Sequence, residues 1–363
     1  MKMRIKVRRT PDGKKKPKPV DESKLGFGKI FSDHMFTMKY SASNGWHEPF
    51  IGPYKPLSLD PAAMCFHYGQ EVFEGMKAYR GKNNAIYLFR PYENARRMNR
   101  SAERLCMPGV DEELFVEAVT KLVLIDKDWI PAGVGTSLYI RPTMVAAETA
   151  LGVQPSSEYL FFVIIGPVGA YYPEGFSPTK IYVMEDFVRS APGGTGQCKA
   201  AGNYAASLAA GRIAHSMGYT QVLWLDAIHR KYVEEVGTSN IFFVIGETLI
   251  TPPLGGTILP GITRDSVLRI AHHWGLPVEE RPLSMDEIVA AVGDGRLREA
   301  FASGTAAVVS PIGMIYYRGD EHLINNGKVG SLTERFYNEI IQIQYGDKDD
   351  PFGWRVEIAP PTS

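Results

Sequence analysis

Cysteines and long apolar runs are scarce in this sequence. The longest apolar stretch, residues 159–172, contains Gly and Pro and is shorter than the ~20 residues that a membrane-spanning helix needs. Three cysteines, Cys65, Cys106 and Cys198, stand far apart, so neither a disulfide framework nor a cysteine metal site is indicated. No HExxH pattern is present either. We therefore expect a cytoplasmic protein with no membrane segment and no metal.

An excess of charge of one sign is also missing. The 363 residues hold 40 Lys+Arg and 40 Asp+Glu. A general nucleic-acid binder would show a strongly basic domain, so we expect no nucleic-acid partner. Nine of the basic residues lie within residues 1–19, and no apolar run follows them that would make an export signal. The pattern predicts a flexible basic tail over residues 1–20.

The sequence has an ordinary globular composition, with 44% apolar and 22% charged residues. Its length exceeds what one hydrophobic core usually supports, which favours two domains. Strand and helix patterns are mixed, which predicts α+β domains rather than a doubly wound fold. The expected elements are helices over residues 91–105, from Asp111, from a cap at Asn203 and after Gly261, with strands over residues 137–146, 159–165, 179–188 and 221–226.

A glycine-rich turn, Gly193–Lys199 (GGTGQCK), carries the most unusual lysine of the chain. It fits neither a Walker loop, because Lys199 lies between Cys198 and Ala200, nor a dinucleotide fingerprint, because Lys199 occupies the third glycine position. Most lysines are simply surface residues. The small residues around Lys199 could instead shield its amine, and a neutral lysine amine attacks carbonyls. Lys199 is therefore a candidate Schiff-base lysine.

A Schiff-base lysine points to pyridoxal phosphate, which needs three further partners. The helix that opens at Gly261 offers backbone amides for a phosphate, and the turn at Ser303 offers hydroxyls. Glu235 stands in an apolar strand and could bind the pyridine nitrogen. Tyr204 follows Lys199 by five residues and could bind the phenolic oxygen. Each candidate is weak alone, and only their joint presence favours the cofactor.

These residues occur within longer motifs, and with them the chain resembles the branched-chain amino acid aminotransferases of the fold-type IV pyridoxal-phosphate class over residues 25–345. The motifs are Phe27–Met35, His67-Tyr68, Phe73–Lys77, Arg90-Pro91, Arg97–Ala102, Ser137–Pro142, Gly193–Lys199, Gly202–Tyr204, Glu235–Thr238, Leu259–Gly261 and Ser303–Ala306. The longer, eukaryotic-like form of the family is the more similar one.

The resemblance implies a homodimer of two-domain α+β / α/β chains with the cofactor in the interdomain cleft. The expected boundaries are a small N-terminal α/β domain over residues 21–168, a linker over 169–179 and a large pyridoxal-phosphate domain over 180–363.

The family's cofactor and substrate residues can be carried over position by position. The cofactor-binding matches are Arg97, Lys199, Tyr204, Glu235, Ile262, Thr263 and Thr305, with Lys199 as the catalytic residue that forms the Schiff base. The substrate-binding matches are Phe27, Tyr68, Phe73, Tyr139, Arg141, Val153, Tyr171, Thr238 and Ala306. Val153 matches a residue that reaches the neighbouring subunit's pocket. One departure is clear: mammalian members have a CxxC redox pair where this chain has Ala307 and Ser310.

The resemblance implies a ping-pong transaminase that moves the amino group of leucine, isoleucine or valine to 2-oxoglutarate. Tyr139 and Arg141 are two apart in a predicted strand and should share a face, which suits a pocket for both an alkyl group and a carboxylate. Two alternatives remain. A D-amino acid aminotransferase or an aminodeoxychorismate lyase would share Lys199, Arg97 and Glu235, and a binding module without catalysis could use the glycine-rich turns for phosphate.

Overall fold

The computed structural model describes residues 3–133, 135–169 and 176–360. The chain forms two compact units, each with its own sheet. Unit 1 comprises Met1–Tyr171, Cys198–Gly202 and Gln342–Ser363, and unit 2 comprises Tyr172–Gln197 and Asn203–Ile341. The two-unit α/β architecture is the one expected from the sequence.

Unit 1 is built on a nine-stranded sheet in the order β1-β3-β2-β8-β7-β5-β6-β18, with β4 also paired to β7. Its strands are β1 (Lys6–Val7), β2 (His34–Ser41), β3 (Gly45–Pro53), β4 (Glu71–Phe73), β5 (Met76–Arg80), β6 (Ile86–Phe89), β7 (Ser137–Ala146), β8 (Glu158–Val168) and β18 (Arg355–Ala359). Strand β7 has the predicted bounds. Leu138, Ile140 and Met144 on one face of β7 are buried, while Tyr139 and Arg141 on the other are half-buried.

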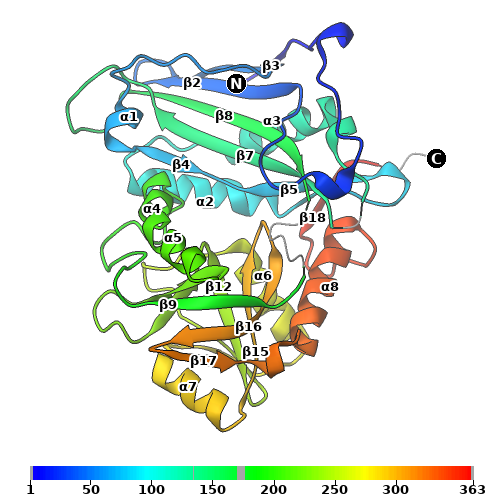
Figure 1. The fold of residues 1–363 in the computed structure, drawn as a ribbon. Coiled ribbons are helices and arrows are strands. Elements are labelled where there is room, and N and C mark those ends of the chain that lie inside the picture. Colours follow the sequence, from blue (N-terminus) through cyan, green and yellow to red (C-terminus); the bar gives the residue numbers. More distant parts are fainter. Residues whose placement is uncertain (1–2, 134, 170–175, 361–363) are drawn as a thin grey trace. The chain divides into compact units, whose positions relative to one another are not determined.

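Helices cover the buried face of this sheet. They are α1 (Met64–Tyr68), α2 (Pro91–Arg104) and α3 (Glu112–Ile125) (Figure 1). Pro at its first turn starts α2, and the Asp111 carboxylate caps α3 by accepting from Leu114 N at 2.9 Å. Met98 of α2 and Phe115 of α3 pack into the same core as the sheet. Both helices confirm the sequence-based prediction.

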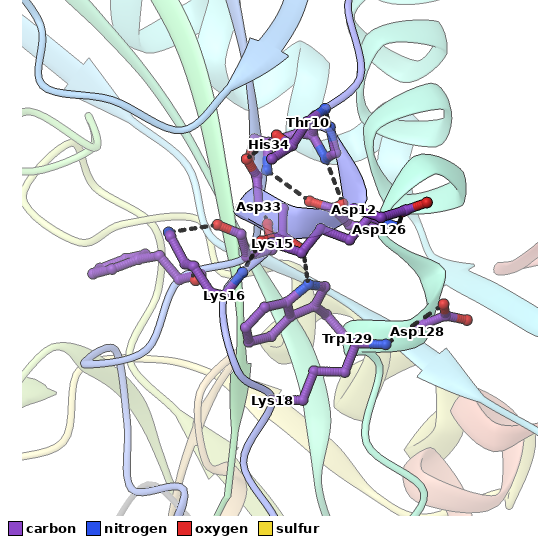
Figure 2. A network of polar contacts seen from close by, with 12 residues as sticks. Thr10, Asp12, Lys15, Lys16, Lys18, Asp33, His34, Asp126, Asp128 and Trp129 are labelled. Carbon is purple, nitrogen blue, oxygen red and sulfur yellow. Dashed lines mark hydrogen bonds and ion pairs between the residues drawn. The ribbon is translucent and has the colours of Figure 1, made fainter.

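The basic N-terminal segment differs from the predicted flexible tail. Strand β1 pairs in parallel with β3, and Ile5 is buried in the core of unit 1. Thr10 is buried as well, and its backbone N–H donates to His34 Nε2 at 2.8 Å. Figure 2 shows the polar contacts that continue along this segment to Lys18. The prediction failed because β3 and His34 lie more than twenty positions away in sequence, beyond the reach of a composition argument.

Unit 2 has a second nine-stranded sheet in the order β11-β10-β9-β16-β15-β12-β13-β14, with β17 paired to β16. Strand β11 also pairs with β12, so six of the strands form a closed ring of pairings. The strands are β9 (Thr179–Met184), β10 (Gln221–Leu225), β11 (Val233–Val236), β12 (Ser239–Ile245), β13 (Thr248–Thr251), β14 (Val278–Glu280), β15 (Leu297–Gly304), β16 (Val308–Tyr317) and β17 (Asp320–Leu323).

The helices of the second half of the chain are α4 (Ala201–Ala206), α5 (Leu208–Ser216), α6 (Ile262–His273), α7 (Met285–Gly293) and α8 (Ser331–Tyr345). The predicted cap at Asn203 is wrong. Asn203 lies inside α4, and its side chain contacts Thr195 O at 2.8 Å and Thr195 Oγ1 at 2.7 Å. It therefore links the glycine-rich turn to the helix that follows. No helix within the described residues is long and apolar enough to cross a bilayer.

Two segments group differently from the expected domain boundaries. Strand β18 pairs with β6, so the C-terminal end of the chain joins the first sheet rather than the second. The segment Cys198–Gly202 also belongs to unit 1, and its Ala200 forms an antiparallel β-bridge with Val72 of β4. Both groupings depend on backbone pairing between residues far apart in sequence, which local sequence patterns cannot predict.

Candidate active site

Lys199 is held on unit 1 by its backbone. Its N–H donates to Ser101 Oγ of α2 at 2.9 Å, and its carbonyl accepts from Phe73 N at 3.1 Å. The Lys199 ammonium lies 4.8 Å from the centroid of the Phe73 ring. The end of the glycine-rich turn is thus attached to both a strand and a helix, and the amine has a defined place on an aromatic face.

Beside Lys199 lies a buried ion pair between Glu74 and Arg97. Arg97 Nε donates to Glu74 Oε1 at 2.7 Å and Nη2 donates to Oε2 at 2.8 Å, while Asn94 Nδ2 also donates to Oε2 at 2.8 Å. Burial by itself would raise the pKa of Glu74. The charge and hydrogen bonds of Arg97, with a smaller contribution from the charge of Lys199, outweigh burial and lower that pKa. Glu74 is therefore a carboxylate.

Arg97 was expected to bind phosphate. In the structure its Nε and Nη2 atoms face Glu74, and the side chain is 4% exposed. The guanidinium is consequently fixed in orientation by a bidentate contact. Glu74 stands in the Phe73–Lys77 motif, but its acidic side chain was not recognised from the sequence as the partner of Arg97.

Tyr139 and Arg141 share a face of β7, as the spacing predicted. Arg141 Nη2 donates to the Tyr139 hydroxyl at 3.0 Å, and the guanidinium carbon lies 4.8 Å from the Phe73 ring centroid. The ring of Phe27 meets Tyr139 edge-on at 4.8 Å between centroids. Gly75 keeps this place open, because a Cβ there would collide with the Tyr139 hydroxyl. Three aromatic rings and one guanidinium thus lie together on one face of the unit 1 sheet.

Lys77 lies on the same face, directly opposite Tyr139 across the β5–β7 pairing. It is 6% exposed. Burial lowers the pKa of Lys77 to about 7. A lysine in this state gains or loses its proton near neutral pH, so Lys77 is unusually acidic for a lysine.

Unit 2 supplies a buried carboxylate, Glu235 on β11. The side chain is 2% exposed, and its Oε2 lies 2.6 Å from Arg189 Nε. Asn240 Nδ2 donates to Glu235 Oε1 at 3.2 Å and to Leu259 O at 2.9 Å. The cationic partner and the amide donor compensate for the burial of this carboxylate and fix its orientation.

Sequence reasoning missed Arg189. Its Nη1 donates to Thr257 O at 2.7 Å, and both Nη atoms contact Gly196 O at 3.1 and 3.2 Å. One guanidinium thus joins Glu235, the glycine-rich turn and the loop before α6. The available signal was an arginine shortly after a predicted strand and just before the glycines of the turn. Gly196 is required there, because a Cβ would collide with Thr257 O and Ser190.

The neighbouring carboxylate, Glu234, has different partners. Its Oε1 accepts from Thr257 Oγ1 at 2.5 Å. Burial raises the pKa of Glu234, and the Thr257 hydrogen bond and the charge of Arg189 only partly oppose that rise. Arg189 Nε contacts Glu235, which agrees with the choice of Glu235 over Glu234 as the ring partner but does not test it.

The expected phosphate cradle begins at Ile262 and Thr263, the first residues of α6. The N-cap is Gly261, which offers no side chain to cap the helix. A Cβ at Gly261 would collide with Asn240 Oδ1, so the glycine lets the helix start close to the residue that holds Glu235. Ser303 lies opposite Asn240 across the β12–β15 pairing, and among the described residues no group hydrogen-bonds to its buried hydroxyl. A buried orphan hydroxyl of this kind fits a polar group bound in this unit.

The other predicted residues lie in turns or on exposed surfaces. Thr305 and Ala306 form the turn between β15 and β16, Thr238 is exposed in the turn between β11 and β12, and Tyr204 is half-buried in α4. Tyr68 ends α1 with 39% exposure, and Val153 is 87% exposed in unit 1. Tyr171 lies outside the described residues.

Comparison with known families defines the class of this protein. The model of the family described as amino-transferase class IV matches residues 71–315. The chain belongs to this family and is a transaminase, as the sequence predicted. The fold prediction is confirmed by solved structures: a branched-chain amino acid aminotransferase from Escherichia coli has a TM-score of 0.75 at 27% identity, covering 90% of this chain and 99% of that chain.

Particular relatives narrow the class. The chain is similar to branched-chain-amino-acid aminotransferase 2 of Bacillus subtilis, with 53% identity over 95% of each chain. It is also similar to the branched-chain amino acid aminotransferase of Thermobaculum terrenum in its PLP form, with a TM-score of 0.72 and 25% identity over 92% of this chain and 100% of that one.

Proposed function

We propose that this chain is a branched-chain-amino-acid aminotransferase that uses pyridoxal 5′-phosphate. It would transfer the amino group of leucine, isoleucine or valine to 2-oxoglutarate in two half-reactions. The names of the relatives support this assignment. The observation that carries it is the face formed by Phe27, Phe73, Tyr139 and Arg141, which offers apolar surface and a guanidinium together.

The residues of the chain fit the cofactor. When bound, pyridoxal phosphate supplies an aldehyde that joins to amines and a ring that accepts electrons from the substrate Cα. Lys199 would hold the aldehyde, and Tyr204 would contact the phenolic oxygen. The amides of Ile262 and Thr263, with Thr305 and Arg97, would hold the phosphate. The uncapped start of α6 and the orphan hydroxyl of Ser303 support this assignment.

Two polar residues would carry out proton transfer and charge stabilisation. Lys199 Nζ would take the proton from the substrate Cα as a base and return a proton as an acid, which requires an amine that reaches the reacting atom. Glu235 would hold positive charge at the ring nitrogen, because Arg189 and Asn240 keep its carboxylate oriented. Glu235 and Arg189 are both buried, so the attraction between Glu235 and a positively charged ring nitrogen would be stronger than it is in water.

The substrate side chain would lie on the unit 1 sheet face. An isobutyl group would pack on Phe27, Phe73 and Tyr139, whereas the γ-carboxylate of glutamate would take a charge-assisted hydrogen bond from Arg141. Tyr68, Tyr171, Thr238 and Ala306 would complete the pocket. The same surface can then serve both half-reactions in turn.

We further propose a cytoplasmic homodimer. Val153 is highly exposed, which suits a residue that contacts a second copy of the chain. The cysteines are free thiols in the structure, as suits a reducing compartment.

The test is steady-state transamination with leucine, isoleucine, valine and D-alanine, each with 2-oxoglutarate, for the wild type and Lys199→Ala. We expect glutamate from the three branched L-amino acids and turnover reduced at least about a thousandfold in Lys199→Ala. Circular dichroism should show an unchanged fold in the variant. Turnover of D-alanine in preference to leucine would favour the D-amino acid alternative, and wild-type rates in Lys199→Ala would contradict the role of Lys199.

A further inference from the structure

We propose that the basic N-terminal segment, residues 5–18, is a strap that sets the position of the segment carrying Phe27, and that Lys16 is its main positioning residue. The link from this strap to substrate affinity rests on the proposed function, in which Phe27 contacts the substrate. The clamping of the segment by the strap does not rest on it.

The strap is anchored at its start by backbone and core contacts. Strand β1 pairs with β3, Arg8 N donates to Ile51 O at 2.9 Å, and Ile5 packs into the core. Thr10 N then donates to His34 Nε2, while His34 Nδ1 lies 2.6 Å from Asp126 Oδ1 (Figure 2). Because Nε2 accepts the hydrogen bond from Thr10, Nδ1 carries the N–H that donates to Asp126.

Lys16 attaches the strap to residues 31–33. Its Nζ donates to Phe31 O at 3.1 Å and to Ser32 O at 2.7 Å, and its backbone N–H donates to Asp33 Oδ1 at 2.8 Å. The ammonium also lies 4.0 Å from the Tyr54 ring centroid, and Tyr54 stacks on Phe31 at 5.5 Å. Trp129 Nε1 donates to the other oxygen of Asp33 at 2.9 Å. Lys16 thus binds three consecutive residues through one side chain and one amide.

The segment before these residues carries Phe27 between two glycines. Phe27 stands between Gly26 and Gly28, which both have positive φ, at 58° and 71°. Glycines in this conformation impose few contacts of their own. Backbone contacts also tie the segment to the end of β8, where Ser32 N donates to Ile165 O and Gly169 N donates to Gly26 O, both at 2.9 Å. Ile30 O approaches so closely that a Cβ at Gly166 would collide with it.

The segment is therefore held between β8 on one side and the strap on the other. Loss of Lys16 would free the carbonyls of Phe31 and Ser32 while the β8 contacts remain. The ring of Phe27, which meets Tyr139 edge-on, would then sample more positions. A looser aromatic wall lowers the affinity for an alkyl side chain more than it lowers the chemical step.

The experiment compares Lys16→Met with the matched control Lys15→Met and the conservative variant Lys16→Arg. Lys15 is the adjacent lysine, about half exposed, and pairs with Asp12 at 2.7 Å. Each protein, loaded with pyridoxal phosphate, is measured by amide hydrogen exchange over residues 26–33 and by kcat and KM for leucine. A Lys16→Met chain that fails to fold is replaced by Asp33→Asn, which weakens the acceptor of the Lys16 amide.

We expect exchange over residues 26–33 to rise roughly tenfold in Lys16→Met. KM for leucine should rise roughly three- to tenfold, with kcat within about twofold. Lys15→Met should match the wild type, and Lys16→Arg should recover part of the loss. Unchanged exchange in Lys16→Met would overturn the proposal, as would a rise in exchange with no change in KM. If the wild type has no activity with leucine, the proposed function fails, and exchange still decides whether Lys16 clamps the segment.

Discussion

Each unit buries a glutamate paired with an arginine, and the two pairs are built differently. In unit 1 the carboxylate of Glu74 is the centre: Arg97 contacts both of its oxygens, and Asn94 and the Gly75 amide contact it as well. In unit 2 the guanidinium of Arg189 is the centre: it contacts Glu235 and two backbone carbonyls.

The difference indicates different roles. A carboxylate enclosed by donors from its own unit serves to hold a strand end against a helix. A guanidinium shared between a carboxylate and two loops fixes the direction of that carboxylate. We infer that Glu74 contributes mainly to stability, by holding the Arg97 side chain, and that the Arg189–Glu235 pair contributes mainly to catalysis. The predictions below test that division.

The largest effect should come from Glu74→Gln. The change leaves the Arg97 charge buried without its carboxylate, which typically costs about 3–5 kcal/mol of unfolding free energy. Urea unfolding of the wild type and the variant measures the loss. The control is Glu93→Gln. This change removes a partly exposed partner of Arg96 on α2, the helix that carries Arg97, and should cost about 0–1 kcal/mol. Similar losses in the two variants would contradict the structural role of Glu74.

In unit 2, Glu235→Gln should act on rate. A neutral amide cannot stabilise positive charge on a ring nitrogen, so we expect kcat to fall by roughly a hundredfold. Arg189 would keep its hydrogen bonds to the carbonyls of Gly196 and Thr257, so the free energy of unfolding should fall less than in Glu74→Gln. The matched control is Glu234→Gln, whose carboxylate contacts Thr257 instead. A greater rate loss in Glu234→Gln would show that Glu234, and not Glu235, contacts the ring nitrogen.

Arg141→Met separates the two half-reactions. The variant keeps an apolar side chain beside Phe73 and Tyr139 but loses the cation. Loss of a charged hydrogen-bond partner costs about 1.5–3 kcal/mol, so single-turnover kcat/KM for glutamate should fall by roughly tenfold to a hundredfold while the value for leucine changes little. Equal losses with both substrates would show that Arg141 supports the scaffold rather than recognises the carboxylate.

Near pH 8 the smallest effect concerns Lys77, a buried amine that is not part of either pair. An unfolded lysine keeps its proton up to about pH 10.4, whereas the pKa of Lys77 in the fold is about 7. Between these values the unfolded state binds more protons, so stability should rise with pH above about 7. Relative to Lys77→Met, the wild-type free energy of unfolding should rise by up to about 1.4 kcal/mol per pH unit. Parallel pH profiles would mean that Lys77 keeps its proton in the fold.

The sequence predicted the features that depend on nearby residues. Strand β7 and helices α2, α3 and α6 follow from periodicity, caps and proline placement, and the shared face of Tyr139 and Arg141 follows from strand geometry. The role of Lys199, inferred from its glycine-rich turn, stays a prediction. What could not be predicted depends on distant partners: the strap formed by residues 5–18, the return of β18 to the first sheet, and the contact between Arg189 and Glu235. Each joins positions that are far apart in sequence, so no local pattern reports it.

Lys199 is the amine proposed to bind the cofactor, and Lys77 is its strongest rival because its lowered pKa leaves a large share of its amine neutral near pH 7. The most direct measurement is borohydride reduction of the pyridoxal-phosphate-loaded protein, followed by mass spectrometry of its peptides. The account predicts one phosphopyridoxyl group per chain, on the peptide that contains Lys199, and its loss when leucine is added before the reduction. A label on Lys77, or a label on Lys199 that leucine does not remove, would contradict the account.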